Sequence, residues 1–304
     1  MGKNLKETIK EIVRYHLKKQ KGIALGQCLT AVGWVGGTLP ELYEKDGMIE
    51  LSMADVAGGG IAVGTALMGK RPIYVIRYQG FNWYNAPMIV NYACKSKEIW
   101  NIPCPMLVRG IAMEGGIGPV AGSSHHSLYF RMPGITIFSP MSPNEYKKVY
   151  KHFMKHNDVI YVSEHRGSFS NSKDLPDLID DKPTFIIFAV SITRFESIKV
   201  REYFKKLKIK VSVINIFQIK PFKIKNNWIK ALKKSKFGGI VLDDDYVNGV
   251  AKSLANDLAN KSNKLIYTMG LKEKSAGFSR TTDNLPPSHK EIIKKIKKII
   301  SKEH

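Results

Sequence analysis

The sequence has few cysteines, no long apolar run and a shortage of acidic residues. Its three cysteines, Cys28, Cys94 and Cys104, are scattered through apolar segments. An odd, scattered set argues against a disulfide framework or a zinc site and favours reduced thiols in the cytosol. No run of about 18 apolar residues occurs, which argues against a membrane span, and the first residues lack the apolar core of a signal peptide. We therefore expect a cytoplasmic protein without a membrane partner.

The shortage of acidic residues leaves a strong positive charge. Lys and Arg number 48 against 26 Asp and Glu, a formal net charge of +22. One interpretation is nucleic-acid or membrane binding. The alternative is that solvated, lysine-rich helix faces carry the charge, and an acidic partner subunit is a third possibility. No nucleic-acid motif accompanies the lysines, so we favour the solvated faces and expect no nucleic-acid partner.

The chain is long enough for two ordinary domains. Strands are predicted at 22–26, 49–53, 72–76, 105–108, 135–138 and 159–162. Helices are predicted between them, at 4–19, 39–44, from Asp55 onward, at 82–97 and at 143–155. A glycine-rich loop is predicted at 33–38. Alternation of this kind is typical of a parallel sheet covered by helices.

A second alternating unit follows a polar, turn-rich segment that we interpret as a linker, residues 166–183. Its strands are predicted at 184–190, 210–216, 239–243 and 264–268, and an amphipathic helix at 290–301 closes the chain. The predicted fold class is α/β, with two doubly wound domains spanning residues 1–165 and 184–304.

One stretch organises the first unit, from Asp55 to Lys95. Four glycines lie in the helix that Asp55 opens: Gly58, Gly59, Gly60 and Gly64. Glycine is a poor helix former, and its lack of a Cβ atom allows close approach of another backbone or a ligand. A strand follows and leads to a loop carrying Tyr78 and Phe81. A carboxylate at a helix start and an aromatic ring at a strand end predict a slot for a flat, nitrogen-containing ring.

A long glycine-rich loop over residues 110–125 ends beside His125 and His126. Loops of this length in compact domains are usually functional. Adjacent histidines there are candidates for proton transfer or for binding an anionic substrate. A histidine metal site is the rival interpretation, but the sequence shows no third ligand at useful spacing.

From Asp55 to Lys95 the sequence resembles, without a gap, the transketolase-like pyrimidine-binding family. The resemblance is to the beta subunit of the 2-oxo acid dehydrogenase first component and to split transketolases. Further matching motifs are 105–110, 133–135, 139–140, 219–221 and 285–287. The resemblance implies the two-domain α/β fold, with a carboxyl-terminal domain of the transketolase type, and thiamine diphosphate as cofactor.

The resemblance assigns roles to residues of the central stretch. Asp55 matches a family glutamate that binds a ring nitrogen of the cofactor's aminopyrimidine and so sets its protonation state. An aspartate is shorter by one methylene, which places its carboxylate about 1.5 Å farther back on an unchanged backbone. Phe81 matches the aromatic that stacks on the pyrimidine, and Tyr78 is a candidate to line the same pocket. The alternatives are a helix cap for Asp55 and a core position for Phe81.

The family's catalytic histidine has no counterpart at the matching position, which is Ala121. His125 and His126 are candidates to replace it. The missing histidine and the shorter acid favour non-oxidative chemistry (decarboxylase, carboligase or ketolase) over an oxidative 2-oxo acid dehydrogenase. A noncatalytic subunit that keeps only the fold is the third alternative. The resemblance implies a substrate that is a 2-oxo acid or a ketose, cleaved or joined next to its carbonyl.

The Gly-Asp-Gly motif that holds the diphosphate and its divalent metal in the family is absent, and Asn226-Asn227 has none upstream. The chain therefore resembles half of an active site. The resemblance implies an alpha-type partner that holds Mg²⁺ and the diphosphate, an alpha2beta2 assembly, and self-association through the carboxyl-terminal domain. The run Asp243-Asp244-Asp245 is expected to be either a solvated strand end or a partner contact.

Overall fold

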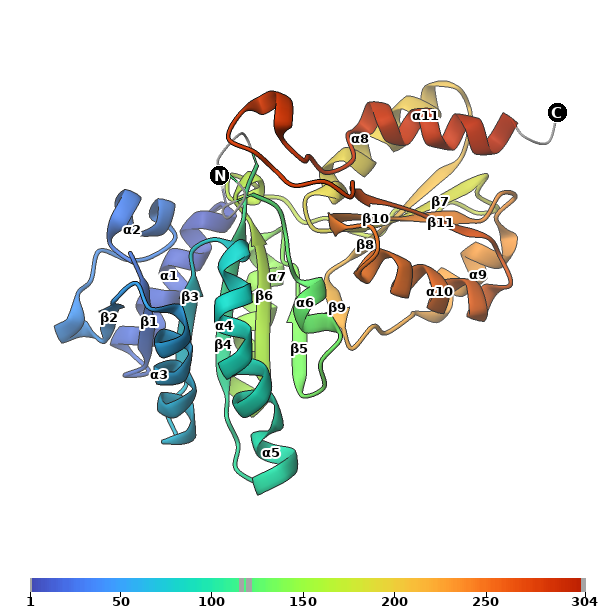
Figure 1. Ribbon diagram of the computed structural model, residues 1–304. Helices are drawn as coiled ribbons and strands as arrows, with labels where there is room; N and C mark the ends of the chain where they lie inside the picture. The colour runs from blue at the N-terminus through green and yellow to red at the C-terminus, as the bar shows by residue number, and fades with distance from the viewer. Residues whose placement is uncertain (1, 115–117, 119–121, 302–304) are drawn as a thin grey trace.

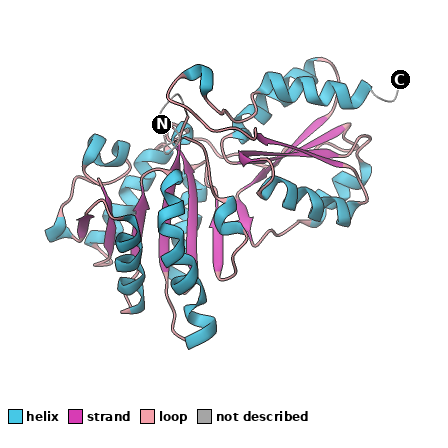
Figure 2. Cartoon of the chain, in the orientation of Figure 1, coloured by secondary structure: helices cyan, strands magenta, loops and turns pink. Residues whose placement is uncertain are grey.

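The computed structural model describes residues 2–114, 118 and 122–301, and they form an α/β protein with two sheets (Figures 1 and 2). The first sheet has seven strands in the order β2-β1-β3-β4-β6-β5-β9, and the second has four in the order β11-β10-β7-β8. All pairings are parallel except that of β5 with β9. The predicted fold class is confirmed.

The first sheet is covered by helices on both faces, which explains its nearly continuous apolar strands. Its strands are β1 (Ile23–Gln27), β2 (Met48–Leu51), β3 (Pro72–Ile76), β4 (Met106–Ala112), β5 (Ile135–Phe138), β6 (Val159–His165) and β9 (Gln218–Lys220). One face packs against α1 (Leu5–Lys18) and α7 (Pro143–Lys155). The other packs against α3 (Asp55–Leu67), α4 (Asn82–Met88), the π-helical turn η3 (Ile89–Ala93) and α5 (Cys94–Trp100).

The second sheet comprises β7 (Phe185–Val190), β8 (Val211–Ile216), β10 (Gly239–Tyr246) and β11 (Ile266–Leu271). Helices α8 (Thr193–Lys206) and α11 (His289–Ile300) cover one face, and α9 (Asn226–Lys234) and α10 (Val250–Ser262) cover the other (Figure 1). Strand β9 belongs to the second half of the chain but pairs with β5 of the first sheet. The proposed domain boundaries at 165 and 184 stay a prediction.

Two local predictions were incomplete or wrong. Residues 39–44 form no helix: Pro40 carries no N–H donor, the main-chain N–H of Leu42 bonds the carbonyl of Pro40, and only η1 (Glu44–Asp46) follows. Most of the loop predicted at 33–38 belongs to α2 (Ala31–Gly37), a left-handed turn whose central residues have φ between 49° and 63°. Each L-residue held there costs about 1–2 kcal/mol.

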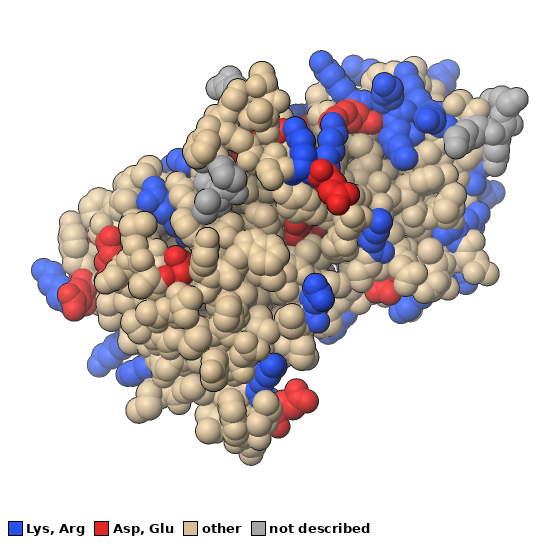
Figure 3. Space-filling model, viewed as in Figure 1, with Lys and Arg blue, Asp and Glu red and all other residues tan. Residues whose placement is uncertain are grey.

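Charge is unevenly spread over the surface. Figure 3 shows Lys and Arg side chains gathered over α8 and α11, while the face over α3 and α4 carries few charges. Among the described residues, no helix combines the length and apolarity needed to cross a membrane.

Candidate functional site

A cavity opens at the carboxyl ends of β1 and β3, where parallel α/β sheets bind their ligands. Its volume is about 130 Å³, and Asp55, Tyr78 and Phe81 all line it. The structure therefore brings these three predicted residues together. An apolar cavity of about 150 Å³ holds a benzene ring, so this space suits a single six-membered ring.

One oxygen of Asp55 is held and the other is open. Asn85 Nδ2 donates a hydrogen bond of 2.7 Å to Asp55 Oδ1 and one of 2.9 Å to the carbonyl of Phe81. The hydroxyl of Tyr74 donates to Asn85 Oδ1 at 2.5 Å. Within the described part of the chain, Asp55 Oδ2 has no hydrogen-bond partner. The carboxylate is thus oriented by the protein and retains one acceptor for a ligand.

The close approach to the glycine-rich helix occurs at Gly58. A Cβ atom there would lie 2.9 Å from the hydroxyl oxygen of Tyr74. Glycine at this position therefore lets Tyr74, and with it Asn85, reach the start of α3. The prediction for these glycines was close approach of a backbone or a ligand; at Gly58 the group that approaches is a neighbouring side chain.

The other wall of the cavity is aromatic. The rings of Tyr78 and Phe81 lie 6.1 Å apart at 37°, and the ring of Tyr84 lies 6.5 Å from that of Phe81. The guanidinium of Arg77 lies 5.2 Å from the centre of the Tyr78 ring. The rings of Tyr78 and Phe81 offer a stacking surface in the same cavity as the carboxylate.

Sequence reasoning missed two polar residues of this site, Asn85 and Gln27. Gln27 ends β1 and lines the cavity, and its Nε2 is buried without a partner among the described residues. Its place at the carboxyl end of a parallel strand was the signal that could have identified it. An unsatisfied donor, an open carboxylate oxygen and an aromatic wall together suit a flat heteroaromatic ring.

The two histidines occupy different environments. The main-chain N–H of His125 donates to Gln79 Oε1 at 2.7 Å. Its ring lies between Trp83, at 6.4 Å, and Tyr246, at 6.1 Å, and lines a second cavity of about 670 Å³. Burial lowers the pKa of His125 below its usual 6.5, so the ring is neutral at pH 7.

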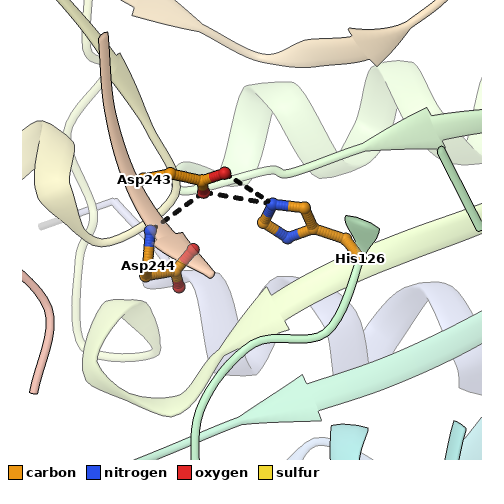
Figure 4. Close-up of side chains that lie close together, drawn as sticks. All are labelled: His126, Asp243 and Asp244. Carbon is orange, nitrogen blue, oxygen red and sulfur yellow. Dashed lines mark hydrogen bonds and ion pairs between the residues drawn. The ribbon is translucent and has the colours of Figure 1, made fainter. Parts of the chain in front are cut away.

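His126 is fully buried between the two halves of the chain. Its Nδ1 lies 3.0 Å from Ser163 Oγ, and its Nε2 lies 3.1 Å from Asp243 Oδ1 at the end of β10 (Figure 4). Burial lowers the pKa of His126, but Asp243, with Asp245 and Asp244 behind it, raises that pKa to about 10. His126 is therefore a protonated member of an internal ion pair.

The expectation of a solvated strand end or a partner contact for Asp243-Asp244-Asp245 is wrong, since all three are at most 2% exposed. Asp244 Oδ2 accepts hydrogen bonds from Ser124, at 2.7 Å, and Ser191, at 2.6 Å. Burial raises the pKa of Asp244 to about 6. The three aspartates are buried because β10 ends against the loop of the first half of the chain that carries the two histidines.

The sequence showed no third ligand beside the histidines, but the structure supplies one candidate group. Ligand atoms of His126, Asp243 and Asp244 lie within 4.8 Å of one another. His126 and Asp243 contact each other directly, so these side chains form an ion pair and not an open metal site. Ala121, the position that matches the family histidine, lies outside the described residues.

The short turn η2 (Gln79–Phe81) contacts residues of both cavities. Phe81 at its end lines the ring cavity, while Gln79 at its start accepts a hydrogen bond from the backbone of His125, which lines the second cavity.

The chain combines a parallel-sheet fold with a ring-sized cavity at its strand ends. Residues 10–171 match the family model described as "Transketolase, pyrimidine binding domain". This is more than half of the chain, and the chain belongs to that family.

Relatives of known function are distant. The chain is 22% identical to the "Pyruvate dehydrogenase E1 component subunit beta" of Rickettsia felis, over 86% of each chain. It is 28% identical to the "2-oxoisovalerate dehydrogenase subunit beta" of Bacillus subtilis, over 48% of this chain and 46% of that one. A solved structure, "Split gene transketolase, inactive beta4 tetramer", matches over 100% of both chains with a TM-score of 0.74 and 12% identity. At this low identity, the similarity to the solved structure shows a shared fold.

Proposed function

We propose that this chain is the beta-type, pyrimidine-binding subunit of a two-chain thiamine-diphosphate-dependent enzyme. The observation that carries the proposal is the carboxylate of Asp55. It is fixed by Asn85 through one oxygen and open through the other, in the ring-sized cavity of a transketolase pyrimidine-binding domain. The reaction makes or breaks a carbon–carbon bond next to the carbonyl of a 2-oxo acid or ketose.

The aminopyrimidine of thiamine diphosphate fits the residues that line the cavity. Asp55 Oδ2 would accept from a ring nitrogen, and Gln27 Nε2, unpaired within the part of the chain that the structure describes, supplies a donor in the same cavity. Phe81, with Tyr78, would stack on the ring. When bound, the cofactor supplies the carbanion chemistry of its thiazolium carbon.

The chain's own residues hold and move protons in this scheme. Asn85 fixes the direction of the Asp55 carboxylate, which sets the protonation of the ring nitrogen. Asn85 and Tyr74 fix the orientation of the shorter aspartate side chain from behind the cavity. His125, neutral at pH 7 and beside the large cavity, is the group available for proton transfer to substrate. His126 is paired with Asp243 and positions the loop instead.

A partner chain completes the site. Both relatives named above carry "subunit beta" in their names. Exposed apolar side chains are concentrated on α3, α4, η3 and α5, the face with few charges in Figure 3. They include Met53, Val56, Met68, Trp83, Tyr84, Tyr92 and Trp100. A patch of this kind marks a protein–protein contact. We assign it to an alpha-type subunit that holds Mg²⁺ and the diphosphate, in an alpha2beta2 assembly.

Non-oxidative chemistry is the form of this proposal that we favour, because the chain departs from the oxidative pattern at Asp55 and at Ala121. The oxidative alternative has support from the names of the relatives, which are dehydrogenase subunits. A complex that reduces a lipoyl domain in the presence of pyruvate would decide for the oxidative alternative.

The test is copurification with an alpha-type chain encoded beside this one, followed by turnover with and without thiamine diphosphate and Mg²⁺. Turnover should need both chains and both added components. Asp55→Ala should abolish it while the two chains still copurify. Unchanged turnover in that variant would support a noncatalytic subunit and overturn the proposal.

A further inference from the structure

One buried side chain, that of Gln79, joins three segments at the carboxyl edge of the first sheet. Gln79 opens η2 and is 0% exposed. Its amide nitrogen donates to the carbonyl of Gly110 at 3.2 Å, to Ser163 Oγ at 2.9 Å and to the carbonyl of Glu164 at 3.3 Å. Its amide oxygen accepts the main-chain N–H of His125 at 2.7 Å. Both polar atoms are therefore used, and they join β4 and β6 to the loop that carries His125.

The same hydrogen-bonded network continues into the second half of the chain. Ser163 Oγ, which accepts from Gln79, also lies 3.0 Å from His126 Nδ1. His126 in turn pairs with Asp243 at the end of β10 (Figure 4). All four side chains are fully buried. The loop is therefore held at two successive residues, at the backbone of His125 and at the side chain of His126.

A glutamine in this position is not explained by packing alone. Burying an amide costs free energy, and its hydrogen bonds repay that cost with only a small net gain. An apolar side chain would fill the same space at least as well. What Gln79 adds is a fixed spacing between the loop of His125 and the turn that ends at Phe81. Phe81 lines the ring cavity and His125 lines the larger cavity, so this spacing relates the two.

We propose that Gln79 is a positioning residue that fixes the backbone of His125, and with it the place of the imidazole relative to the ring cavity. Gln79 acts through His125, by holding its amide against β4 and β6. That the imidazole transfers a proton rests on the proposed function, whereas the hydrogen bond that holds the amide does not.

The first test uses the full chain alone, without cofactor or partner. Labelling histidine with nitrogen-15 restricts the amide spectrum to the 8 histidines, and the signal of His125 is identified by its absence in His125→Gln. Hydrogen exchange of this amide should become at least about tenfold faster in Gln79→Met, which keeps the side-chain length but removes the acceptor. Gln79→Asn withdraws the oxygen by about 1.5 Å and should have the same effect. It decides the question if Gln79→Met does not fold.

Asn215→Leu is the matched control, because Asn215 is also a buried amide with both polar atoms used. Its nitrogen donates to the carbonyl of Pro176 at 2.7 Å and its oxygen accepts from Arg194 Nε at 3.2 Å, in β8 of the second sheet. Urea unfolding should show a lower free energy of unfolding for this variant as for Gln79→Met. The exchange rate of the His125 amide should stay at the wild-type value in Asn215→Leu.

The second test is kinetic and uses the two-chain complex. Gln79→Met should lower kcat by about 10–100-fold, because a misplacement of about 1 Å can cost that much, while KM changes by less than about twofold. When His125→Gln is already present, adding Gln79→Met should lower kcat by less than about a further twofold, since two residues that act through one group are not additive.

Unchanged exchange of the His125 amide in the Gln79 variants would overturn the positioning role. A second loss of kcat in the double variant, as large as that in Gln79→Met alone, would overturn it too, because Gln79 would then act independently of His125. Full turnover in His125→Gln would instead overturn the part of the proposed function that assigns proton transfer to His125. The two failures are distinguishable because the exchange measurement contains no cofactor.

Discussion

Asn85 links Asp55 to Tyr74, with its amide nitrogen 2.7 Å from the carboxylate and its amide oxygen 2.5 Å from the phenol. The three side chains come from α3, α4 and β3 and form one hydrogen-bonded chain behind the cavity. The carboxylate is therefore aimed before any ligand arrives, which is the arrangement that precise acid–base chemistry requires.

Replacing the carboxylate by an amide tests its chemistry without changing its size. Asp55→Asn should lower the turnover of the two-chain complex by about 10²–10⁴-fold, the range for loss of a group that governs proton transfer. The melting temperature should stay close to that of the wild type, since Asp55 is the first residue of α3 and is only partly buried. A turnover within threefold of the wild type would contradict the assigned role, by the same scale of effects.

Asn85→Ala should affect both stability and cofactor binding. It leaves the buried Tyr74 hydroxyl without its partner, which costs about 1–3 kcal/mol, and it frees the held oxygen of the half-buried Asp55. Asn91→Ala is the matched control, because Asn91 is exposed and its side chain, among the residues that the structure describes, hydrogen-bonds to Lys95 alone. Urea unfolding should show a lower free energy of unfolding for the first variant and no change for the second. Equal free energies of unfolding in the two variants would show that the hydrogen bonds of Asn85 do not stabilise the protein.

Phe81→Leu keeps an apolar side chain and removes the ring. Loss of stacking is worth about 1 kcal/mol, or roughly a fivefold higher Kd for thiamine diphosphate in the complex. Titration calorimetry on the two-chain complex measures it. Tyr15→Leu, which changes an exposed aromatic on α1, away from the apolar face, should leave the Kd of the complex unchanged. An unchanged Kd in Phe81→Leu would remove Phe81 from the site.

The pH dependence of turnover should report His125. Burial lowers its pKa below 6.5, so a base at this position stays active at pH 7 and is lost only as the pH falls below 6.5. The profile of kcat/KM should therefore have an acid limb below that value. His125→Gln should remove this limb along with most of the activity. A wild-type acid limb that His125→Gln retains would assign it to another group.

His126 should stabilise the protein in a defined pH window. Its folded pKa, about 10, lies above the unfolded value of 6.5. Its contribution is fully present below pH 6.5 and is lost as the pH rises through 10. His126→Gln also breaks a buried pair, at a cost of about 3–5 kcal/mol. The unfolding free-energy difference between wild type and variant should shrink from pH 7 to pH 10.

His152→Gln is the matched control for that experiment. His152 lies 3.1 Å from Asp158, in the same kind of contact, but both side chains are about 30% exposed. Such pairs contribute about 0–1 kcal/mol. A His126→Gln effect as small as that of His152→Gln, or one constant with pH, would refute the role of the buried pair.

Much of the fold could be predicted from the sequence because apolar runs and turn residues are local signals. Strands β3 and β5 and helix α7 have the predicted bounds, and each is an uninterrupted apolar or amphipathic segment. Asp55, Tyr78 and Phe81 also lie around one cavity, since a helix start and a strand end meet at the same sheet edge. Their functional roles stay predictions.

The remaining features depend on contacts between distant segments. The burial of Asp243 comes from docking β10 against a loop 117 residues earlier in the chain, a separation that no local pattern reports. Asn85 sits among ordinary helix residues, and only its contact with Asp55 gives it a role. The left-handed turn over Ala31–Gly37 contains Val32 and Val35. Because β-branched side chains disfavour the left-handed conformation, the sequence does not predict this turn.

The central claim is that this chain binds the aminopyrimidine of thiamine diphosphate, while a partner chain binds the diphosphate. The most direct measurement is a crystal structure of the copurified two-chain complex grown with thiamine diphosphate and Mg²⁺. The account predicts the aminopyrimidine between Asp55 and Phe81, with the diphosphate on the partner. A cofactor bound far from both residues, or tight binding of thiamine diphosphate by this chain alone, would contradict it.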